Sequence, residues 1–296
     1  MKTAIVILNY KGLDHTLDCL KSIRSLNKNN YGMEIIVVDN NSLDNSCKAL
    51  SKLKDIHLIE NPANLGYSGG NNAGIRYALK RNADSVLILN NDTTVDQNLI
   101  INLVGDLKSA DIISPKIYFS AGFEFHKNRY RSTDPGKVIW YAGGTIDWEN
   151  IIGKHIGVDE VDNSQFENGR EIDFATGACM LVKREVFGKI GLFDEKYFLY
   201  LEDLDFCIRA KKAGFKIIYS PKAIIWHKNA QSAQGSGSNL QDYFITRNRL
   251  LFAFKFARLR TKLAVFKQAL TQLKNPVKRR AFLDFITARF GKGTYF

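Results

Sequence analysis

The first 92 residues alternate short apolar segments with segments of helical pattern, and this alternation constrains the fold more than any other feature. Val, Ile and Leu dominate the apolar segments, and each segment runs into polar residues. Buried strands that alternate with helices are typical of a parallel sheet covered on both faces. We therefore predict an α/β fold with strands at 4–8, 34–38, 56–60 and 85–89, helices at 13–26 and 70–81, and a third helix reaching about residue 53.

Asn and Asp residues gather where these strands and their loops end. A single Asn or Asp there is more often a turn residue. Several on one edge of a parallel sheet indicate a ligand site, because ligands bind beyond the carboxyl ends of the strands. Carboxylates and amides can bind a base, a ribose or a phosphate, and glycine lets the backbone approach the ligand. The candidate nucleotide-binding residues are Asn9, Asp39, Asn41, Asn64, Gly66, Asn71, Asn72, Asn91 and Asp92.

Two further residues suggest a divalent cation, Mg²⁺ or Mn²⁺. Asp92 follows an apolar strand, and Mg²⁺ commonly uses only one or two protein carboxylates beside phosphate oxygens. His227 also follows a predicted strand and could be a second ligand, although a lone histidine is more often structural.

An acidic pair, Glu202-Asp203, follows the aromatic segment 197–200. A carboxylate beside apolar surface can be tuned to accept a proton from a sugar hydroxyl, so both residues are candidate catalytic groups. Capping of the helix predicted at 204–213 by Asp203 explains the pattern equally well.

Several segments together carry a resemblance that no single motif carries. They occur in order over about the first 230 residues: VILNYKG, EIIVVDNNS, NLGYSGGNNAGI, LILNND, TGACMLVKREVF, GLFDEKYFLYLEDLDFCIRAKKAGFKI and WH. The chain resembles the family 2 inverting glycosyltransferases of GT-A fold, in the branch rich in rhamnosyltransferases. That resemblance implies a Rossmann-like, mostly parallel mixed sheet and a nucleotide-sugar substrate.

The resemblance also assigns roles to individual residues. Asp39 would bind the nucleoside, Asn71-Asn72 would lie by the donor, and Asp92 and His227 would hold the metal or diphosphate. Asp203 would be the base. The chain departs from the family pattern at two positions. Asn90 replaces the first Asp of the DxD motif, which leaves one carboxylate and argues against strict Mn²⁺ dependence. Asn71 stands where many relatives have Arg.

The charge of the chain lies in its tail. Residues 244–296 contain 13 Lys or Arg and a single acid, Asp284, which accounts for the whole net charge of +12. We predict a catalytic domain at 1–238 and a basic amphipathic helical tail at 239–296. A neutral body with a basic tail suggests electrostatic binding to a surface.

The tail has an apolar stripe at helical spacing, and we predict one helix that carries it and ends at Pro276, then a second basic piece at 278–292. The stripe is Phe252, Phe256, Leu259, Leu263, Phe266, Leu270 and Leu273. It could pack on the body, form a coiled coil, or lie on an anionic bilayer through residues 244–292. We favour partial packing with the basic face turned to lipid, and we expect no nucleic-acid binding.

The apolar run at 4–8 is too short for a signal peptide, and no apolar stretch has membrane-spanning length. We therefore expect a cytoplasmic protein, peripheral at the inner face of the cell membrane. The four cysteines show no CxxC spacing, which argues against a disulfide framework or a zinc site. Irregular strands and loops at 115–170 are expected to shape an acceptor site. A polar loop at 228–238 is expected to be mobile and to close over the donor.

The predicted function is inverting transfer of a sugar from a nucleotide-diphosphate donor to an acceptor hydroxyl of a growing, lipid-linked surface glycan. Rhamnose from dTDP-rhamnose is the expected donor. A UDP-hexose or UDP-N-acetylhexosamine donor is an alternative within the same reaction. A non-catalytic, membrane-associated nucleotide-binding protein is the alternative of another class.

Overall fold

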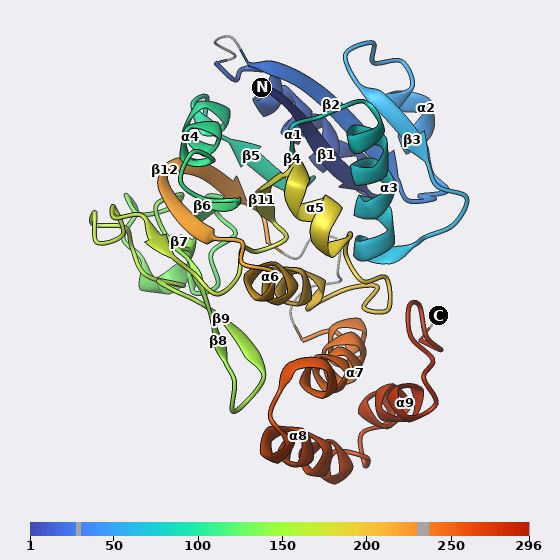
Figure 1. Cartoon of the computed structure of the whole chain (residues 1–296). Helices are drawn as coiled ribbons and strands as arrows, with labels where there is room; N and C mark the ends of the chain where they lie inside the picture. The colour runs from blue at the N-terminus through green and yellow to red at the C-terminus, as the bar shows by residue number, and fades with distance from the viewer. Residues whose placement is uncertain (28–30, 230–236, 296) are drawn as a thin grey trace.

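The computed structural model describes residues 1–27, 31–229 and 237–295, and its centre is a mixed, mostly parallel sheet (Figure 1). The strand order is β10-β12-β6-β11-β4-β1-β2-β3, with β5 beside β12 and β7 beside β6. The strands of its amino-terminal half are β1 (Lys2–Asn9), β2 (Gly32–Asp39), β3 (His57–Glu60), β4 (Ser85–Asn90), β5 (Thr93–Val95) and β6 (Ile112–Phe119). The later strands are β7 (Ile139–Tyr141), β10 (Arg170–Glu171), β11 (Cys179–Lys183) and β12 (Ile217–His227), and β8 (Gly144–Asp147) and β9 (Ile152–His155) form a separate hairpin.

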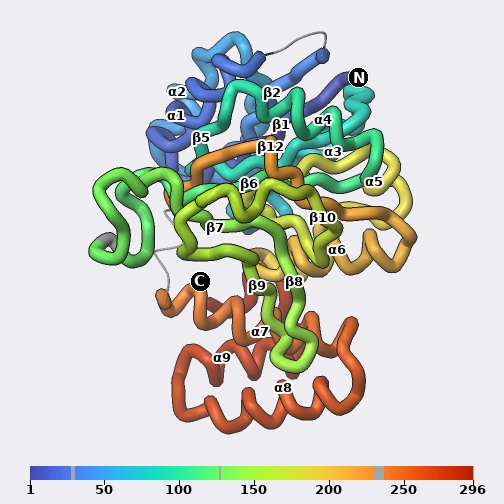
Figure 2. Tube along the Cα trace, turned by 90° about the vertical axis from the view of Figure 1, so that its left-hand side faces the viewer, coloured from blue at the N-terminus to red at the C-terminus, as the bar shows by residue number. Residues whose placement is uncertain are grey.

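Helices cover both faces of the sheet, and Figure 2 shows α1 on the opposite side from α3. The helices of the sheet domain are α1 (Leu13–Arg24), α2 (Ser46–Leu50), α3 (Gly66–Lys80), α4 (Leu99–Asp106), α5 (Arg184–Ile190) and α6 (Glu202–Lys212). The expected α/β fold is confirmed. Two helices differ from expectation: α2 is a short five-residue helix, and α3 begins at Gly66, within the segment predicted as a loop.

Three parallel strands end at the same level, and this common end positions the site. Asn9, the last residue of β1, pairs with Asp39, the last residue of β2, and Leu8 pairs with Asn90 at the end of β4. The strands are in register because each presents an unbroken apolar run to the core, and Ile5, Val6 and Ile7 are fully buried. We call the ends of β1, β2 and β4 the carboxyl edge.

The antiparallel strand β11 lies next to β4, with Cys179 opposite Leu89. It runs the other way, so its beginning lies at the carboxyl edge. The Asn90 amide donates to the Ala178 carbonyl at 3.0 Å, which ties residues 176–178 to this edge. The predicted pair of strands around Pro221 is instead the single strand β12, with an irregularity between Ser220 and Ile224.

Strand β12 ends at His227, which pairs with Thr93 of β5 and with Phe119 of β6. This pairing brings a histidine from late in the chain to the residues that follow β4. The predicted mobile loop at 228–238 falls largely on residues 230–236, which lie outside the described residues.

The tail forms three helices below the sheet domain: α7 (Asn239–Phe256), α8 (Leu259–Thr271) and α9 (Pro276–Ile286) (Figure 1). The prediction of one helix through the apolar stripe is wrong. Ala257 and Arg258 have extended backbones, so the helix breaks there and the stripe is divided. Phe252 on α7 is fully buried, whereas Leu259 on α8 is 72% exposed. Pro276 begins α9 instead of ending a run, because Asn275 caps the amides of Val277 and Lys278.

Helix α7 packs on the body and on the other two tail helices. The tip of the β8–β9 hairpin also touches it, since the Trp148 and Phe252 rings are 6.0 Å apart and Arg249 Nε donates to the Asn150 carbonyl at 2.7 Å. None of the helices in the described part of the chain is long and apolar enough to cross a membrane.

A pair of glycine substitutions tests the close contact of α3 with the sheet. A Cβ on Gly74 would lie 2.4 Å from Val6 Cγ1, and Val6 is buried in β1. We expect Gly74→Ala to lower the unfolding free energy by about 1–3 kcal/mol through overpacking. The same change at the exposed Gly105 of α4, where nothing lies within 4 Å, should raise it by about 0.5–1 kcal/mol. Urea denaturation measures both, and a gain at Gly74 would contradict the packing.

Candidate active site

Asp39 is held at the carboxyl edge by its neighbours. Asn9 Nδ2 donates to Asp39 Oδ1 at 2.6 Å, and the backbone amide and hydroxyl of Ser42 donate to its two oxygens at 2.9 and 2.6 Å. Burial opposes ionisation of Asp39, but these hydrogen bonds outweigh it and hold its pKa below the ordinary value. A fixed carboxylate thus lies at the end of β2.

The same network reaches the end of β4. Thr16 of α1 donates to Asn9 Oδ1 at 2.8 Å, and Asn91 Nδ2 donates to the Thr16 hydroxyl at 3.0 Å. Asp39, Asn9, Thr16 and Asn91 therefore form one continuous chain of hydrogen bonds across three strand ends and α1. Sequence reasoning missed Thr16 and Ser42, because a hydroxyl near a turn has no distinctive pattern.

Asp92 and His227 form a buried pair beside this network. His227 Nε2 lies 3.1 Å from Asp92 Oδ1, and the two residues are each 4% exposed. Burial opposes ionisation of Asp92, but the charge of His227 and the hydrogen bond from it outweigh the effect of burial. The pKa of Asp92 therefore lies below the ordinary value. His227 Nδ1 is buried and has no hydrogen-bond partner among the described residues. The ring of Trp140 packs edge-on against His227, with centroids 4.6 Å apart.

This pair would fit a divalent cation that takes its remaining ligands from a bound substrate or water. The donor set is one carboxylate and one imidazole with an unpaired buried nitrogen. No cluster of three or more His, Cys, Asp or Glu side chains suited to a metal occurs within 1–27, 31–229 and 237–295. Asp92 and His227 are the two ligands that this part of the chain offers, and Asn90 stands where a second aspartate would be.

Glu202 and Asp203 begin α6. Asp203 Oδ2 accepts from the Gly177 amide and Oδ1 from the Leu204 amide, both at 2.9 Å. The Asp203 carboxylate thus binds one amide in the first turn of α6 and one in the segment before β11. The helix begins at Glu202 with Leu201 as its N-cap residue and no side-chain cap, so the prediction that Asp203 caps a helix at 204–213 is wrong. Burial raises the pKa of Asp203. Glu202 is 5% exposed, and its Oε2 has no partner among the described residues. Burial, and to a smaller extent the charge of Asp203, raises the pKa of Glu202 well above the ordinary value.

Tyr67 of α3 binds the segment that holds Asp203. Its hydroxyl donates to the carbonyl of Gly177, whose amide binds Asp203. Burial raises the pKa of Tyr67 well above its ordinary value. Gly177 thus links the first turn of α3 to the first turn of α6.

Asn40, which sequence reasoning passed over, organises the 61–66 loop. Its Nδ2 donates to Asn64 Oδ1 at 2.9 Å and to the Gly66 carbonyl at 3.1 Å, and its Oδ1 accepts from Asn61 at 3.0 Å. Asn64 in turn accepts from the Gly66 amide. The neighbouring Asn41 is half-buried and has a left-handed backbone with φ of +60°.

The two asparagines of α3 differ. Asn71 donates to the Tyr67 carbonyl, and its Oδ1 is buried without a partner in the described part of the chain. Asn72 uses its amide fully within the protein, donating to the Phe193 carbonyl and Glu195 and accepting from the Phe193 amide. Asn71 thus has a free acceptor for a ligand, while Asn72 joins α3 to the 193–195 loop.

Comparison with known proteins adds a family and a fold. The model of glycosyl transferase family 2 matches residues 4–191. "Low-salt glycan biosynthesis hexosyltransferase Agl10" of Haloferax volcanii is 31% identical over 251 residues, 84% of this chain and 74% of that protein. "dTDP-rhamnosyl transferase RfbF" of Shigella flexneri is 24% identical over 75% of this chain and 71% of that protein.

A solved structure, "GalNAc-T7 with UDP, GalNAc and Mn2+", superposes with a TM-score of 0.60 at 14% identity. The match covers 97% of this chain and 56% of that one. At that identity the likeness concerns the fold, which is GT-A.

Replacing Glu202 by Gln tests its buried, protonated state. An acid whose folded pKa is raised above its unfolded value releases a proton on unfolding, so wild-type stability falls as the pH rises above the unfolded pKa of about 4.3. Glu202→Gln has no such proton. We therefore expect the stability of Glu202→Gln relative to wild type to be greater at pH 8 than at pH 5, measured by urea unfolding at both. A difference independent of pH would contradict the raised pKa.

Proposed function

The chain belongs to glycosyl transferase family 2 and is a glycosyltransferase, and from this premise we propose that it transfers rhamnose from dTDP-rhamnose to a hydroxyl of a growing, lipid-linked surface glycan. The proposal is supported by hydrogen bonds that link Asp39 through Asn9 and Thr16 to Asn91, the neighbour of Asp92, and that tie Asp203 and Asn90 to the 176–178 segment. Asp39, Asp92 and Asp203 are distant in sequence, and a nucleotide-diphosphate donor and its acceptor need all three.

The donor is bound along the edge in this proposal. Asp39 and Asn9 hold the nucleoside, with Asn41, Asn64, Gly66, Asn71 and Asn91 forming the surrounding wall. Asn72, which the sequence also suggested for the donor site, instead binds the 193–195 loop. Asp92 and His227 would hold Mg²⁺ or Mn²⁺, which would supply positive charge next to the diphosphate. The unpaired His227 Nδ1 and Asn71 Oδ1 support this assignment, because a buried polar atom without a partner is costly unless a ligand satisfies it.

Asp203 is the base in this proposal. It takes the proton from the acceptor hydroxyl while that oxygen attacks the anomeric carbon from the face opposite the diphosphate, which inverts the configuration in one displacement. The new glycosidic bond forms as the bond to the diphosphate breaks. Burial raises the pKa of Asp203 towards the working pH, which makes it a better proton acceptor. Glu202, buried beside it and neutral, leaves Asp203 as the charged member of the pair.

The donor sugar is the finer part of the proposal. The Shigella flexneri relative is named for dTDP-rhamnose, whereas the Haloferax volcanii relative is named only as a hexosyltransferase. A UDP-hexose or UDP-N-acetylhexosamine donor is therefore the competing proposal for the same site. Donor hydrolysis measured over dTDP-rhamnose, UDP-glucose, UDP-galactose and UDP-N-acetylglucosamine separates the two.

We also propose that the tail binds an anionic membrane surface at the inner face of the membrane, where a lipid-linked acceptor would lie. Helices α8 and α9 expose Leu259, Leu263, Leu270, Leu283 and Ile286, each at least 43% accessible. Exposed basic residues occur on the same two helices or in the segments next to them: Arg258, Arg260, Lys267, Lys274, Arg279, Arg280 and Arg289. Helices that expose both apolar and basic side chains suit the boundary between lipid headgroups and acyl chains.

Asp203→Asn tests the base. We expect kcat to fall by about 10²–10⁴-fold, because the amide cannot accept the proton, while affinity for the nucleoside diphosphate stays near wild type. In the wild type, the acidic limb of the pH–rate profile should lie above the range of an ordinary aspartate, because activity falls as Asp203 becomes protonated. Asp242→Asn, on the exposed side of α7, is the control and should keep full activity. An active Asp203→Asn would remove this residue from the mechanism.

Charge reversal tests the membrane surface. The triple change Arg260→Glu, Lys267→Glu and Lys274→Glu should weaken binding to anionic vesicles by at least about 3 kcal/mol, roughly a hundredfold, since each basic residue contributes about 1 kcal/mol. The control reverses three exposed lysines of the body, Lys52, Lys54 and Lys108, and carries the same net charge. Co-sedimentation with vesicles measures both. Equal losses would show that net charge, and not this surface, is responsible.

A further inference from the structure

The loop that leads into Glu202 and Asp203 has an unusual backbone. Three of its residues have left-handed conformations: φ is +63° at Phe198, +70° at Tyr200 and +68° at Leu201. Each such conformation costs about 1–3 kcal/mol for a residue other than glycine, and it persists only where the surroundings impose it. Leu201 immediately precedes the first turn of α6, so this loop sets the position of the acidic pair.

Helix α7 supplies the contacts that impose this conformation. Asn248 Nδ2 lies 2.9 Å from the Tyr197 carbonyl, 2.8 Å from that of Leu199 and 2.9 Å from that of Tyr200. Its two hydrogens are thus shared among three carbonyls of the 196–201 loop. Asn248 is fully buried, so water does not satisfy these carbonyls in its place.

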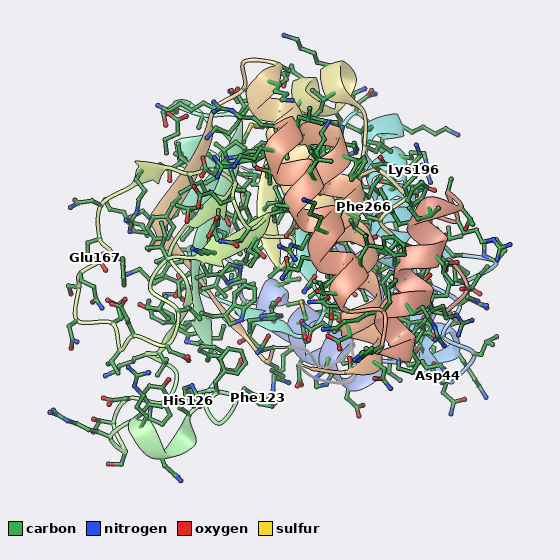
Figure 3. All side chains as sticks on the ribbon, turned by 90° about the horizontal axis from the view of Figure 1, so that it is seen from below. Asp44, Phe123, His126, Glu167, Lys196 and Phe266 are labelled. Atoms are coloured by element: carbon green, nitrogen blue, oxygen red, sulfur yellow. The ribbon has the colours of Figure 1, made fainter. Side chains whose placement is uncertain are left out.

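Arg247, the neighbouring residue, orients the Asn248 amide. Its Nε donates to Asn248 Oδ1 at 3.0 Å, which leaves the amide nitrogen facing the loop. Its Nη2 donates to the carbonyls of Lys196 and Tyr197 at 3.1 and 3.0 Å. Seen from below, Lys196 lies beside the tail helices (Figure 3). Arg247 is also fully buried, and burial lowers the pKa of its guanidinium. The backbone carbonyls that it binds stabilise its charge and offset part of the cost of removing it from water.

The other side of the 196–201 loop binds helix α3, whose Gly66 and Asn71 belong to the proposed binding site for the nucleotide-sugar donor. The Phe198 carbonyl accepts from the amides of Tyr67 and Ser68, in the first turn of α3, at 2.6 and 3.2 Å. A Cβ on Gly66 would lie 2.4 Å from this carbonyl, so the contact is close. Arg247 and Asn248 therefore act on a loop that touches the donor side of the site and carries the base at its end.

A second contact from α7 supports the same region. Lys255 Nζ binds Asp194 at 2.9 Å and also binds Asp205, which accepts from the Tyr197 hydroxyl at 3.0 Å. Asp194 precedes the loop and Asp205 follows it. Helix α7 thus contacts the loop at both ends and along its length.

We propose that Arg247 and Asn248 are positioning residues for Asp203, so that α7 is part of the active site and not only part of a basic tail. The assignment rests on the proposed function, in which Asp203 is the base. A base that moves by about 1 Å can lose about a hundredfold in rate, so the geometry of this loop matters for the chemistry. Two basic residues counted in the tail charge, Arg247 and Lys255, then bind groups of the sheet domain instead of lipid.

The test compares Asn248→Ala with Tyr243→Phe in the full-length chain. Tyr243→Phe removes the hydroxyl that binds Asp284 of α9 and the Thr294 amide, and it leaves the Asn248 side chain and its bonds to the three loop carbonyls in place. We expect Asn248→Ala to lower kcat, expressed per nucleoside-diphosphate binding site, by at least about tenfold, and Tyr243→Phe to change it less than about twofold. Counting binding sites by calorimetry corrects for any unfolded fraction.

Two further readouts separate positioning from loss of stability. In Asn248→Ala the loosened loop should let water reach Asp203, which lowers its pKa and moves the acidic limb of the pH–rate profile to lower pH. Hydrogen exchange at amides 199–205 should also be faster than in Tyr243→Phe. Asn248→Asp is a second variant: it keeps the shape and gives Arg247 a carboxylate, but it cannot donate to the three carbonyls, so it should show the same losses.

Wild-type kcat per site and an unshifted pH profile in both Asn248 variants would overturn the proposal. This outcome differs from failure of the proposed function, which would appear as a wild-type protein that transfers and hydrolyses no donor in the panel. The exchange experiment needs no activity, and unchanged exchange at 199–205 would overturn the contact between α7 and the loop by itself.

Discussion

The register of three parallel strands is the constraint on which the rest of the structure depends. Asn9 is opposite Asp39 and Leu8 is opposite Asn90, so β1, β2 and β4 end together and their polar continuations share one edge. A slip of one residue would turn each apolar side chain to the other face of the sheet, which the buried faces do not permit. The hydrogen bonds from Asp39 through Asn9 and Thr16 to Asn91 follow directly from this alignment.

Different surroundings give the acids at this edge different chemistry. Asp39 and Asp92 are buried, yet hydrogen bonds to Asp39 and the charge of His227 beside Asp92 keep their pKa values low, and both remain anionic. Glu202 and Asp203 have few compensating partners, so burial raises their pKa values. A division of this kind, into fixed anions and a tuned proton acceptor, is what a site needs when it both binds a charged donor and accepts a proton.

The tail and the catalytic domain are less separate than their charges suggest. Helix α7 buries Arg247 and Asn248 against the loop before Glu202, and Phe252 against the β8–β9 hairpin. Helix α7 thus packs on the sheet domain, and α8 and α9 pack on α7. The exposed leucine and basic side chains of α8 and α9 are accessible to a membrane surface.

Local pattern predicted β1, β2, β3, β4 and α1, but it placed the start of α3 four residues late and made α2 too long. The ordered motifs carried the family resemblance. Local pattern also offered Asp39, Asp92, Glu202, Asp203 and His227 as candidates, since chemistry-bearing residues at strand ends stand out in an apolar context. Tertiary structure decided the rest. Asn72 is committed to the 193–195 loop, Asn40 organises the loop before α3, the tail helix breaks at Ala257, and Arg247 is buried. The periodicity of a segment reports which face is apolar, but not what packs against it. The bonds from Asn248 to Tyr197 and from Asn72 to Phe193 join residues 51 and 121 positions apart, so they form only once the chain has folded and no local pattern encodes them.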